Sequence, residues 1–315
     1  MKGLSIVVTY YKGEEFIYKC LDSIFGSYAF SNQSLAYEVV LIIDSIEDAH
    51  VANDLAKTYA AKPLIILKND VNIGVSESRN RALKHINYQF YSIIDQDDYV
   101  TERYFPVLEQ ELSTDLAIHI LNAKIENVKA NILTTIYTFK PRISFEGILL
   151  KKTFIYTPGL LIFNSQFIPA ENLFIDTSEV YKGCDDWAAY LNLCIDLKDK
   201  VTQKFIPEVL FVYCLHATNF SNNVSTMISS SVAVLNFLKN KVGVSRSQLK
   251  LIEYSLKMHK FYKNKDIVMM NKGLLFLKSP KSFMYHYFFS FFNLERLNRL
   301  VFKARYQLKL KTKSV

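Results

Sequence analysis

The stretch Tyr91-Ser-Ile-Ile-Asp-Gln-Asp-Asp-Tyr-Val100 carries the clearest sign of the fold of this 315-residue chain. Its apolar first part ends at Ile94 and is typical of a buried strand, and three carboxylates, Asp95, Asp97 and Asp98, follow directly. Ligands of α/β sheets bind at the carboxyl ends of the strands. Clustered carboxylates repel one another, and a divalent cation that holds a diphosphate would offset that repulsion. The alternative is an acidic turn in solvent, because Asp-x-Asp is a short pattern.

Short apolar runs alternate with helical patterns in the part of the chain that leads to this stretch. The runs, which we expect to be strands, are Leu4–Val8, Val39–Ile43, Leu64–Leu67 and Ser92–Ile94. The segments between them carry apolar residues at helical spacing. This alternation predicts a parallel sheet with helices on both faces, whose right-handed crossovers bring the strand ends to one edge. The polar residues expected at that edge are Tyr10, Tyr11, Asp44, Asn72 and Asp95 to Asp98.

Segments in five places resemble, in the expected order, the motifs of family 2 glycosyltransferases with the GT-A fold. They are Ser5–Ile24, Asn72–Leu83, Ile94–Asp98, Gly183–Trp187 and Tyr213–Ser221. The resemblance covers residues 4 to 225 and implies an α/β, Rossmann-like GT-A domain with a mostly parallel sheet, followed by a mostly helical C-terminal extension. We expect a nucleotide-sugar-binding half at 1–100, an acceptor-binding half of the same domain at 101–225, and a helical, basic extension at 226–315.

The resemblance also implies ligands and roles. The donor would be a nucleotide sugar, with a UDP-sugar favoured, bound together with Mn²⁺ or Mg²⁺. The residues implied at the donor are Thr9, Tyr10, Tyr11, Asp44, Asn72, Arg79, Asp95 and Gln96. The residues implied at the metal are Asp97, Asp95 and His216. The implied catalytic base is Asp186, with Asp185 beside it and Trp187 packed behind it.

Several of these residues have a second interpretation. Asp185 and Asp186 could simply open a helix, where acidic residues suit the helix dipole. Arg79 could be an ordinary solvated residue of a helix, and His216 a hydrogen-bonded structural histidine. Side chains of a strand alternate between its faces, so at most one of the paired tyrosines at the first strand's end is expected to face the base.

The predicted chemistry is sugar transfer with inversion. A divalent ion would neutralise the charge on the departing nucleoside diphosphate, and a carboxylate would take the proton of the attacking acceptor hydroxyl. The predicted function is hexosyl or N-acetylhexosaminyl transfer to a saccharide or lipid-linked acceptor in cell-surface polysaccharide synthesis, with Pro158-Gly159 turning beside the acceptor.

One departure from the family pattern leaves alternatives open. The chain has Ile43-Asp44-Ser45-Ile46 where the family usually has Asp-Asp-Gly-Ser, which puts the nucleotide preference in question. A non-catalytic nucleotide-sugar-binding or scaffold protein is therefore an alternative. A nucleotidyltransferase is less favoured, because the first strand is not followed by a Gly-rich phosphate loop. A glycoside hydrolase would also use two carboxylates, but it would not need the nucleotide-binding half that the sequence predicts.

Charge is concentrated near the C-terminus. Residues 246–315 contain 16 Lys and Arg against three Asp and Glu, a net charge of +13, so that the total of +8 leaves −5 for residues 1–245. Basic residues beside the aromatic cluster of residues 283–292 predict attachment to an anionic membrane surface, or alternatively packing on the catalytic domain. We expect a cytoplasmic protein, peripheral on the plasma membrane, with no signal peptide, spanning helix or nucleic-acid partner.

Overall fold

The computed structural model describes residues 2–127, 132–150, 155, 157–171, 173–175, 182–198 and 201–263. Met1–Lys257 form one compact unit. Met258–Val315 form a second unit, of which only the end of a helix, residues 258–263, is described.

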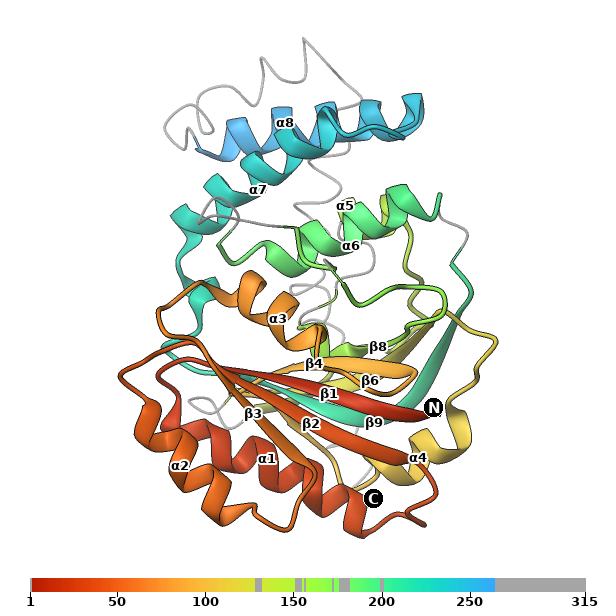
Figure 1. Cartoon of the computed structure of the whole chain (residues 1–315). Helices are drawn as coiled ribbons and strands as arrows, with labels where there is room; N and C mark the ends of the chain where they lie inside the picture. The colour runs from red at the N-terminus through yellow and green to blue at the C-terminus, as the bar shows by residue number, and fades with distance from the viewer. Residues whose placement is uncertain are drawn as a thin grey trace, which may run out of the picture. The chain divides into compact units, whose positions relative to one another are not determined.

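The first unit is built on one mixed sheet (Figure 1). Its strands are β1 (Gly3–Tyr10), β2 (Ala36–Ile43), β3 (Leu64–Lys68), β4 (Phe90–Asp95), β5 (Tyr99–Val100), β6 (Ile118–Asn127), β7 (Ile132–Thr135), β8 (Leu161–Asn164) and β9 (Gln203–Leu215). Their spatial order is β3-β2-β1-β4-β8-β6-β9-β5, and β7 pairs with β6 beside this path. Strands β3, β2, β1 and β4 are parallel, as are β6 and β9. Strand β8 is antiparallel to both β4 and β6, so it joins the two parallel parts.

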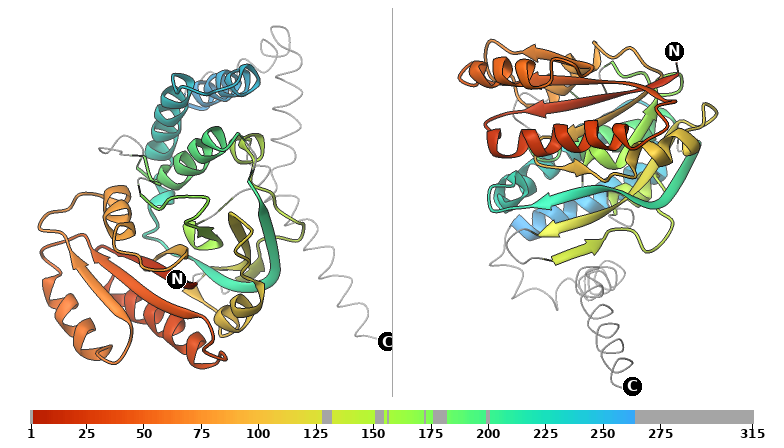
Figure 2. Two further views of the ribbon diagram at one scale, coloured as in Figure 1. Left: turned by 45° about the vertical axis from the view of Figure 1, so that its right-hand side comes forward. Right: turned by 90° about the horizontal axis from the view of Figure 1, so that it is seen from below.

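Helices cover both faces of this sheet. They are α1 (Glu14–Ala29), α2 (Ala49–Thr58), α3 (Val75–Leu83), α4 (Tyr104–Glu111), α5 (Phe145–Leu149), α6 (Asp185–Asp196), α7 (Val224–Lys239) and α8 (Arg246–Lys263). Short 3₁₀ turns lie at η1 (Pro158–Leu160) and η2 (Phe220–Asn222). Helices α1, α2 and α4 lie below the sheet in Figure 1, and α3 and α6 lie above it. Figures 1 and 2 agree that α6 lies between the sheet and α7.

The centre of the sheet is fully enclosed. Every residue of β1 is buried, because β2 and β4 flank the strand and helices cover its faces. Ile6, Val7 and Val8 have no exposed surface, and burial of such a side chain contributes about 1.5–3 kcal/mol. The strand is therefore a rigid support for the residues that follow it.

A crevice is expected where the strand order reverses. The chain places β2 on one side of β1 and β4 on the other, so the connections on the two sides of β1 run in opposite directions. Open α/β sheets bind ligands at such a switch point, outside the carboxyl ends of the strands. The register pairs Tyr10 with Ile43 and Thr9 with Asp95, which brings the ends of β1, β2 and β4 together.

The predicted fold class is confirmed, and the four predicted strands coincide with β1 to β4. The expected helical part beyond residue 225 contains α7 and α8, and Val234, Leu235 and Ile252 on these helices are buried. The domain limits at residues 100 and 225 stay predictions. The aromatic and basic residues 283–313 lie outside the described residues. None of the helices that the structure describes is long and apolar enough to cross a membrane.

Candidate active site

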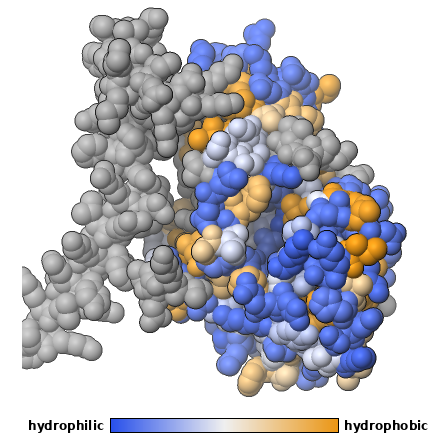
Figure 3. Space-filling view, turned by 90° about the vertical axis from the view of Figure 1, so that its left-hand side faces the viewer, coloured by the Kyte–Doolittle hydropathy of each residue, from blue (hydrophilic) through white to orange (hydrophobic). Residues whose placement is uncertain are grey.

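The carboxyl edge of β1, β2 and β4 gathers most of the residues predicted from the sequence. Figure 3 views the molecule from the side on which these strands end, and the surface there is mainly hydrophilic and hollowed near its centre. Ile46, Val71 and Ile73 are exposed apolar residues of the loops that follow β2 and β3. The edge thus combines charged groups with a few apolar side chains on its loops.

The three aspartates of the acidic motif have different environments. Asp98 is buried, and its carboxylate accepts hydrogen bonds from the Cys214 N–H and the Thr157 hydroxyl, both at 2.9 Å. Asp95 accepts a hydrogen bond from Arg79 Nη2 at 2.5 Å. Burial, followed by the charge of Asp97, raises the pKa of Asp98 well above its ordinary value. Asp98 therefore links the acidic motif to β9 and to the residue before η1.

Asp97 is half-buried and paired with a histidine. Its Oδ2 lies 2.8 Å from His216 Nε2 and 3.3 Å from Asn219 Nδ2. The His216 ring stacks on Phe16 of α1, with ring centres 4.7 Å apart, and this contact fixes its orientation. Burial and the nearby charge of Asp95 raise the pKa of Asp97, and the His216 hydrogen bond opposes that rise. The structure thus brings together Asp97 and His216, as the sequence predicted.

Arg79 is a buried bridge between two carboxylates. It lies on α3, its Nη2 bonds Asp95 at the end of β4, and its Nη1 bonds Asp185 at the start of α6. Its guanidinium carbon lies 5.0 Å from the centre of the Phe174 ring. The interpretation of Arg79 as a solvated helix residue is wrong, because only 4% of it is exposed. Loss of one partner from a buried pair costs about 3–5 kcal/mol, so this bridge firmly links the acidic motif to α6.

Asp186 lies next to this bridge in the first turn of α6. Its Oδ1 accepts a hydrogen bond from the Trp187 N–H at 2.6 Å, and the Trp187 indole N–H donates to the Ile148 carbonyl at 3.2 Å. Asp186 is half-buried. Removal from water and the adjacent charge of Asp185 raise the pKa of Asp186 to about 8. A carboxylate with a pKa near neutrality suits a general base.

Asp44 supports a loop. Its Oδ1 accepts hydrogen bonds from Asn69 Nδ2 at 2.8 Å and the Ile73 N–H at 2.9 Å, and its Oδ2 accepts one from the Gly74 N–H at 3.0 Å. Asn72 Oδ1 also accepts from the Gly74 N–H, at 3.0 Å. Gly74 has a φ of +86°, which favours glycine, and α3 begins directly after it. Asp44 and Asn72, both predicted to lie at the nucleotide-sugar donor, thus shape the turn into α3.

The end of β1 is tied to the acidic motif through Gln96. Its side-chain amide accepts from the Tyr11 N–H at 2.8 Å and donates to the Tyr11 carbonyl at 2.9 Å. A Cβ on Gly13 would come within 2.1 Å of this amide, so a larger residue there would displace it. Tyr10 and Thr9 are buried, whereas 46% of Tyr11 is exposed. One tyrosine of the pair is exposed and the other is buried, in agreement with the alternation expected of a strand.

The acidic motif fits a divalent ion that is bound jointly with a ligand. Buried like charges raise the pKa of Asp97, and a hard cation with oxygen ligands would relieve that repulsion. Asp97 Oδ2 and His216 Nε2 lie 2.8 Å apart in a hydrogen bond, and each could instead offer a ligand to one bound ion. Among the described residues, no group of three His, Cys, Asp or Glu side chains could hold a metal. Phosphate oxygens would have to complete the shell.

Sequence reasoning missed several supporting residues. Thr157 precedes the predicted Pro158-Gly159 turn, and Asn219 and Phe16 support Asp97 and His216 respectively. Asn219 lies within the segment Tyr213–Ser221, so its motif was visible although its role was not. The contacts of Thr157 and Phe16 depend on how distant segments pack, and no local pattern indicates them.

Comparison with known proteins agrees with this fold. The crystal structure of S. aureus TarS 1-349 resembles this structure, with a TM-score of 0.59 and 14% identity. The likeness covers 84% of this chain and 73% of the TarS chain. A mannosyltransferase from Pyrobaculum calidifontis, PcManGT in complex with GDP-Man and Mn²⁺, matches 89% of this chain and 81% of its own, with a TM-score of 0.56 and 12% identity. At such low identity these likenesses show the fold alone, an α/β domain of the GT-A type.

The sequence comparisons identify the family. The model of glycosyl transferase family 2 matches residues 5–167, just over half of the chain, and the chain therefore belongs to this family. The uncharacterized glycosyltransferase EpsJ of Bacillus subtilis (strain 168) is 32% identical over 111 residues, which are 34% of this chain and 30% of EpsJ. The teichoic acid poly(glycerol phosphate) polymerase of Staphylococcus epidermidis is 29% identical over 100 residues, 31% of this chain and 13% of that protein. The matches thus span less than a third of these relatives.

Proposed function

We propose that this protein is an inverting, metal-dependent glycosyltransferase. It moves a sugar from a nucleoside diphosphate donor to a saccharide or lipid-linked acceptor in cell-surface polysaccharide synthesis. The observation that carries the proposal is the arrangement at the carboxyl edge, where Arg79 links the acidic motif to the start of α6 and its half-buried Asp186. The same edge thus offers a site for a metal-bound diphosphate and a candidate base.

On the donor side, Asp97 and His216 would hold the ion together with diphosphate oxygens. The bound ion would neutralise the charge on the departing nucleoside diphosphate. Asp95 has a different role, because its carboxylate accepts the Arg79 bond. We therefore assign Asp97 as the direct ligand and Asp95 as the residue that fixes the motif.

On the acceptor side, Asp186 would remove the proton of the acceptor hydroxyl as its oxygen attacks the sugar. Proton removal by a placed base contributes about 10²–10⁴-fold to the rate. Asp185 has a different task, because its carboxylate is paired with Arg79. We assign Asp186 as the base and Asp185 as the residue that holds Arg79.

The nucleoside would lie over the ends of β1 and β2. Tyr11 is the exposed aromatic residue at the end of β1. The carboxylate of Asp44 is engaged by the loop before α3, so it would act on the base through that loop. A UDP-sugar is the favoured donor, in keeping with the structure of S. aureus TarS 1-349 in complex with UDP-GlcNAc.

Membership of a bacterial surface pathway is supported by the relatives. One is a teichoic acid poly(glycerol phosphate) polymerase, and its name describes synthesis of a surface polymer. Attachment of residues 283–313 to an anionic membrane surface belongs to the same proposal, as does a cytoplasmic location on the inner face of the plasma membrane.

The test is donor hydrolysis. The purified full chain should release UDP from UDP-sugars slowly without acceptor, and only with Mn²⁺ or Mg²⁺ present. A thermal-shift screen of nucleotide sugars identifies the donor first, since a ligand at 100 times its Kd adds about 2.7 kcal/mol to stability. A protein that binds a donor but never releases the nucleoside diphosphate would be a non-catalytic binding protein, and the proposal would be wrong.

A further inference from the structure

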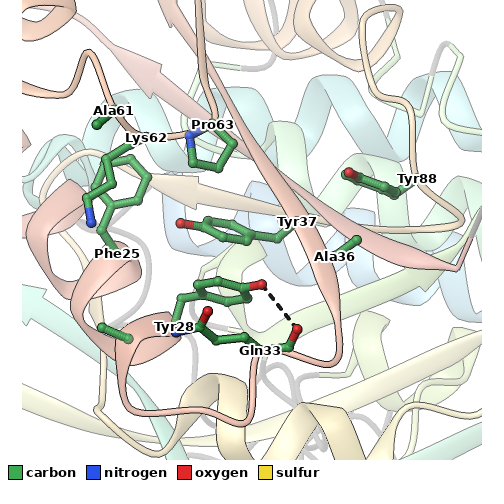
Figure 4. Close-up of a pocket in the computed structure, with 10 residues that line it drawn as sticks. Phe25, Tyr28, Gln33, Ala36, Tyr37, Ala61, Lys62, Pro63 and Tyr88 are labelled. Atoms are coloured by element: carbon green, nitrogen blue, oxygen red, sulfur yellow. Dashed lines mark hydrogen bonds between the residues drawn. The ribbon is translucent and has the colours of Figure 1, made fainter.

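A second hollow lies at the edge of the sheet opposite the candidate active site. It is an open depression of about 470 Å³, a volume within the range of small-ligand sites. In Figure 4, Lys62 lies along one side, Tyr28 and Gln33 along the other, and Tyr37 between them. The hollow lies where β2 and β3 begin and α1 ends.

This hollow is far from the reaction centre. Tyr37 is the second residue of β2, and Asp44 follows the end of the same strand. The seven steps between them, at about 3.3 Å per residue, correspond to roughly 23 Å. A single sugar in the hollow could not also reach Asp44, whereas a chain of several sugars could extend from one edge to the other.

Aromatic rings form the floor of the hollow. The Tyr28 and Tyr37 rings overlap with centres 4.1 Å apart, and Phe25 lies 6.4 Å from Tyr37. Tyr28 and Tyr88 are half-buried, so each presents part of a ring to solvent. Such rings offer an apolar face with a hydroxyl at the edge. They suit a ligand that also has an apolar face and polar edges.

Charges of opposite sign meet at the hollow, and this balance favours a neutral ligand. The Lys62 ammonium lies 5.8 Å from the centre of the Phe25 ring, so a cation already occupies that cation–π position and would repel another. Helix α1 presents its C-terminal end here, and the partial negative charge of a helix C-terminus disfavours phosphate. A pyranose meets both conditions, because its C–H face is apolar, its hydroxyls are polar and its ring is uncharged.

We propose that this hollow is a second saccharide site, which binds a neutral or N-acetylated sugar unit of an extended acceptor. The saccharide binding stands on the hollow itself. The statement that the bound chain is the acceptor rests on the proposed function. Retention of a saccharide chain in the hollow would favour long acceptors over short ones. Once one part of a long chain is held there, binding of its end at the candidate active site becomes intramolecular.

Binding is tested on the full chain with maltohexaose, cellohexaose and chitohexaose, by saturation-transfer NMR and calorimetry up to about 10 mM. We expect at least one of them to bind, and Tyr28→Ala and Lys62→Ala each to weaken it at least fivefold. Lys62 is exposed, so its variant should fold even if loss of Tyr28 disturbs α1. The matched control is Phe30→Ala, at the end of the same helix, where 67% of the phenylalanine is exposed and outside the hollow.

Two results would overturn the proposal. The first is that none of the hexasaccharides binds. The second is that binding is unchanged in both hollow variants, which would place the site elsewhere. Metal-dependent donor hydrolysis, measured in parallel, distinguishes failure of the saccharide site from failure of the proposed function, because hydrolysis does not need the hollow.

Discussion

The titration of Asp186 gives the sharpest test of the proposed chemistry. A general base must be ionised to act, and the environment of Asp186 raises its pKa to about 8. With that pKa, roughly 10% of the carboxyl is ionised at pH 7 and roughly 90% at pH 9. We therefore expect kcat/KM to increase about tenfold between pH 7 and pH 9 and to level off above that.

The Asp186→Asn variant should remove this dependence. Its kcat should fall about 10²–10⁴-fold with donor affinity nearly unchanged, and the remaining activity should be flat between pH 7 and pH 9. Asp196→Asn is the matched control, because Asp196 is an exposed aspartate of the same helix, and its profile should follow the wild type.

The same substitution has a consequence for stability, with a definite sign. Between about pH 4 and pH 8, Asp186 is protonated in the folded state but ionised in the unfolded chain, where the pKa of an aspartate is about 3.9. This group therefore lowers the free energy of unfolding as the pH rises through that range. Asp186→Asn should therefore raise the free energy of unfolding at pH 9 by about 1–3 kcal/mol, since partial exposure reduces the full effect, and should change it little at pH 4.

Two outcomes would refute this reasoning. If kcat/KM of the wild type is already level at pH 6, the carboxyl is ionised well below the expected pKa. If the sloping profile persists in Asp186→Asn, another group titrates. A severe loss in Asp185→Asn combined with a mild one in Asp186→Asn would mean that the base is the neighbouring residue.

Four further predictions address the remaining parts of the molecule. Asp97→Ala should abolish the gain in UDP affinity that Mn²⁺ gives the wild type in calorimetry, and equal wild-type affinity with a chelator would contradict the metal site. Arg79→Met should lower the free energy of unfolding by about 3–5 kcal/mol in urea, whereas Lys84→Met, exposed at the end of the same helix, should change it little. Gly13→Ala should cost about 1–3 kcal/mol by displacing the side-chain amide that binds the end of β1 with two hydrogen bonds. Truncation after Asn298 should weaken cosedimentation with anionic vesicles at low salt and leave donor hydrolysis intact; full-length protein that ignores such vesicles would rule out membrane attachment.

The first half of the fold could be predicted because its signals are local. The runs that became β1 to β4 are mainly apolar, as expected of strands buried on both faces, and each is followed by polar residues. The alternation of faces at Tyr10 and Tyr11 likewise follows from strand geometry alone. Position in a strand therefore determined which residues reach the edge.

The partners of those residues could not be predicted, because they come from distant segments. The sequence indicates that Asp95, Asp97 and Asp98 cluster, but not which of them faces inward, since that depends on Thr157 and the backbone of Cys214. The missing aspartate near Asp44 pointed to nucleotide preference, whereas the carboxylate of Asp44 itself holds the loop before α3. Tertiary contacts decide such assignments.

The continuity of the sheet has a mechanical consequence. Strand β8 pairs with β4 on one side and with β6 on the other, so the predicted donor and acceptor halves share one hydrogen-bonded framework. Opening a hinge between them would break backbone ladders and the buried bridge at Arg79, so we expect substrates to enter and leave by movements of surface loops. The sheet and the Arg79 bridge would then fix the position of the proposed base relative to the acidic motif, and acceptor choice could diverge in the loops without altering the reaction itself.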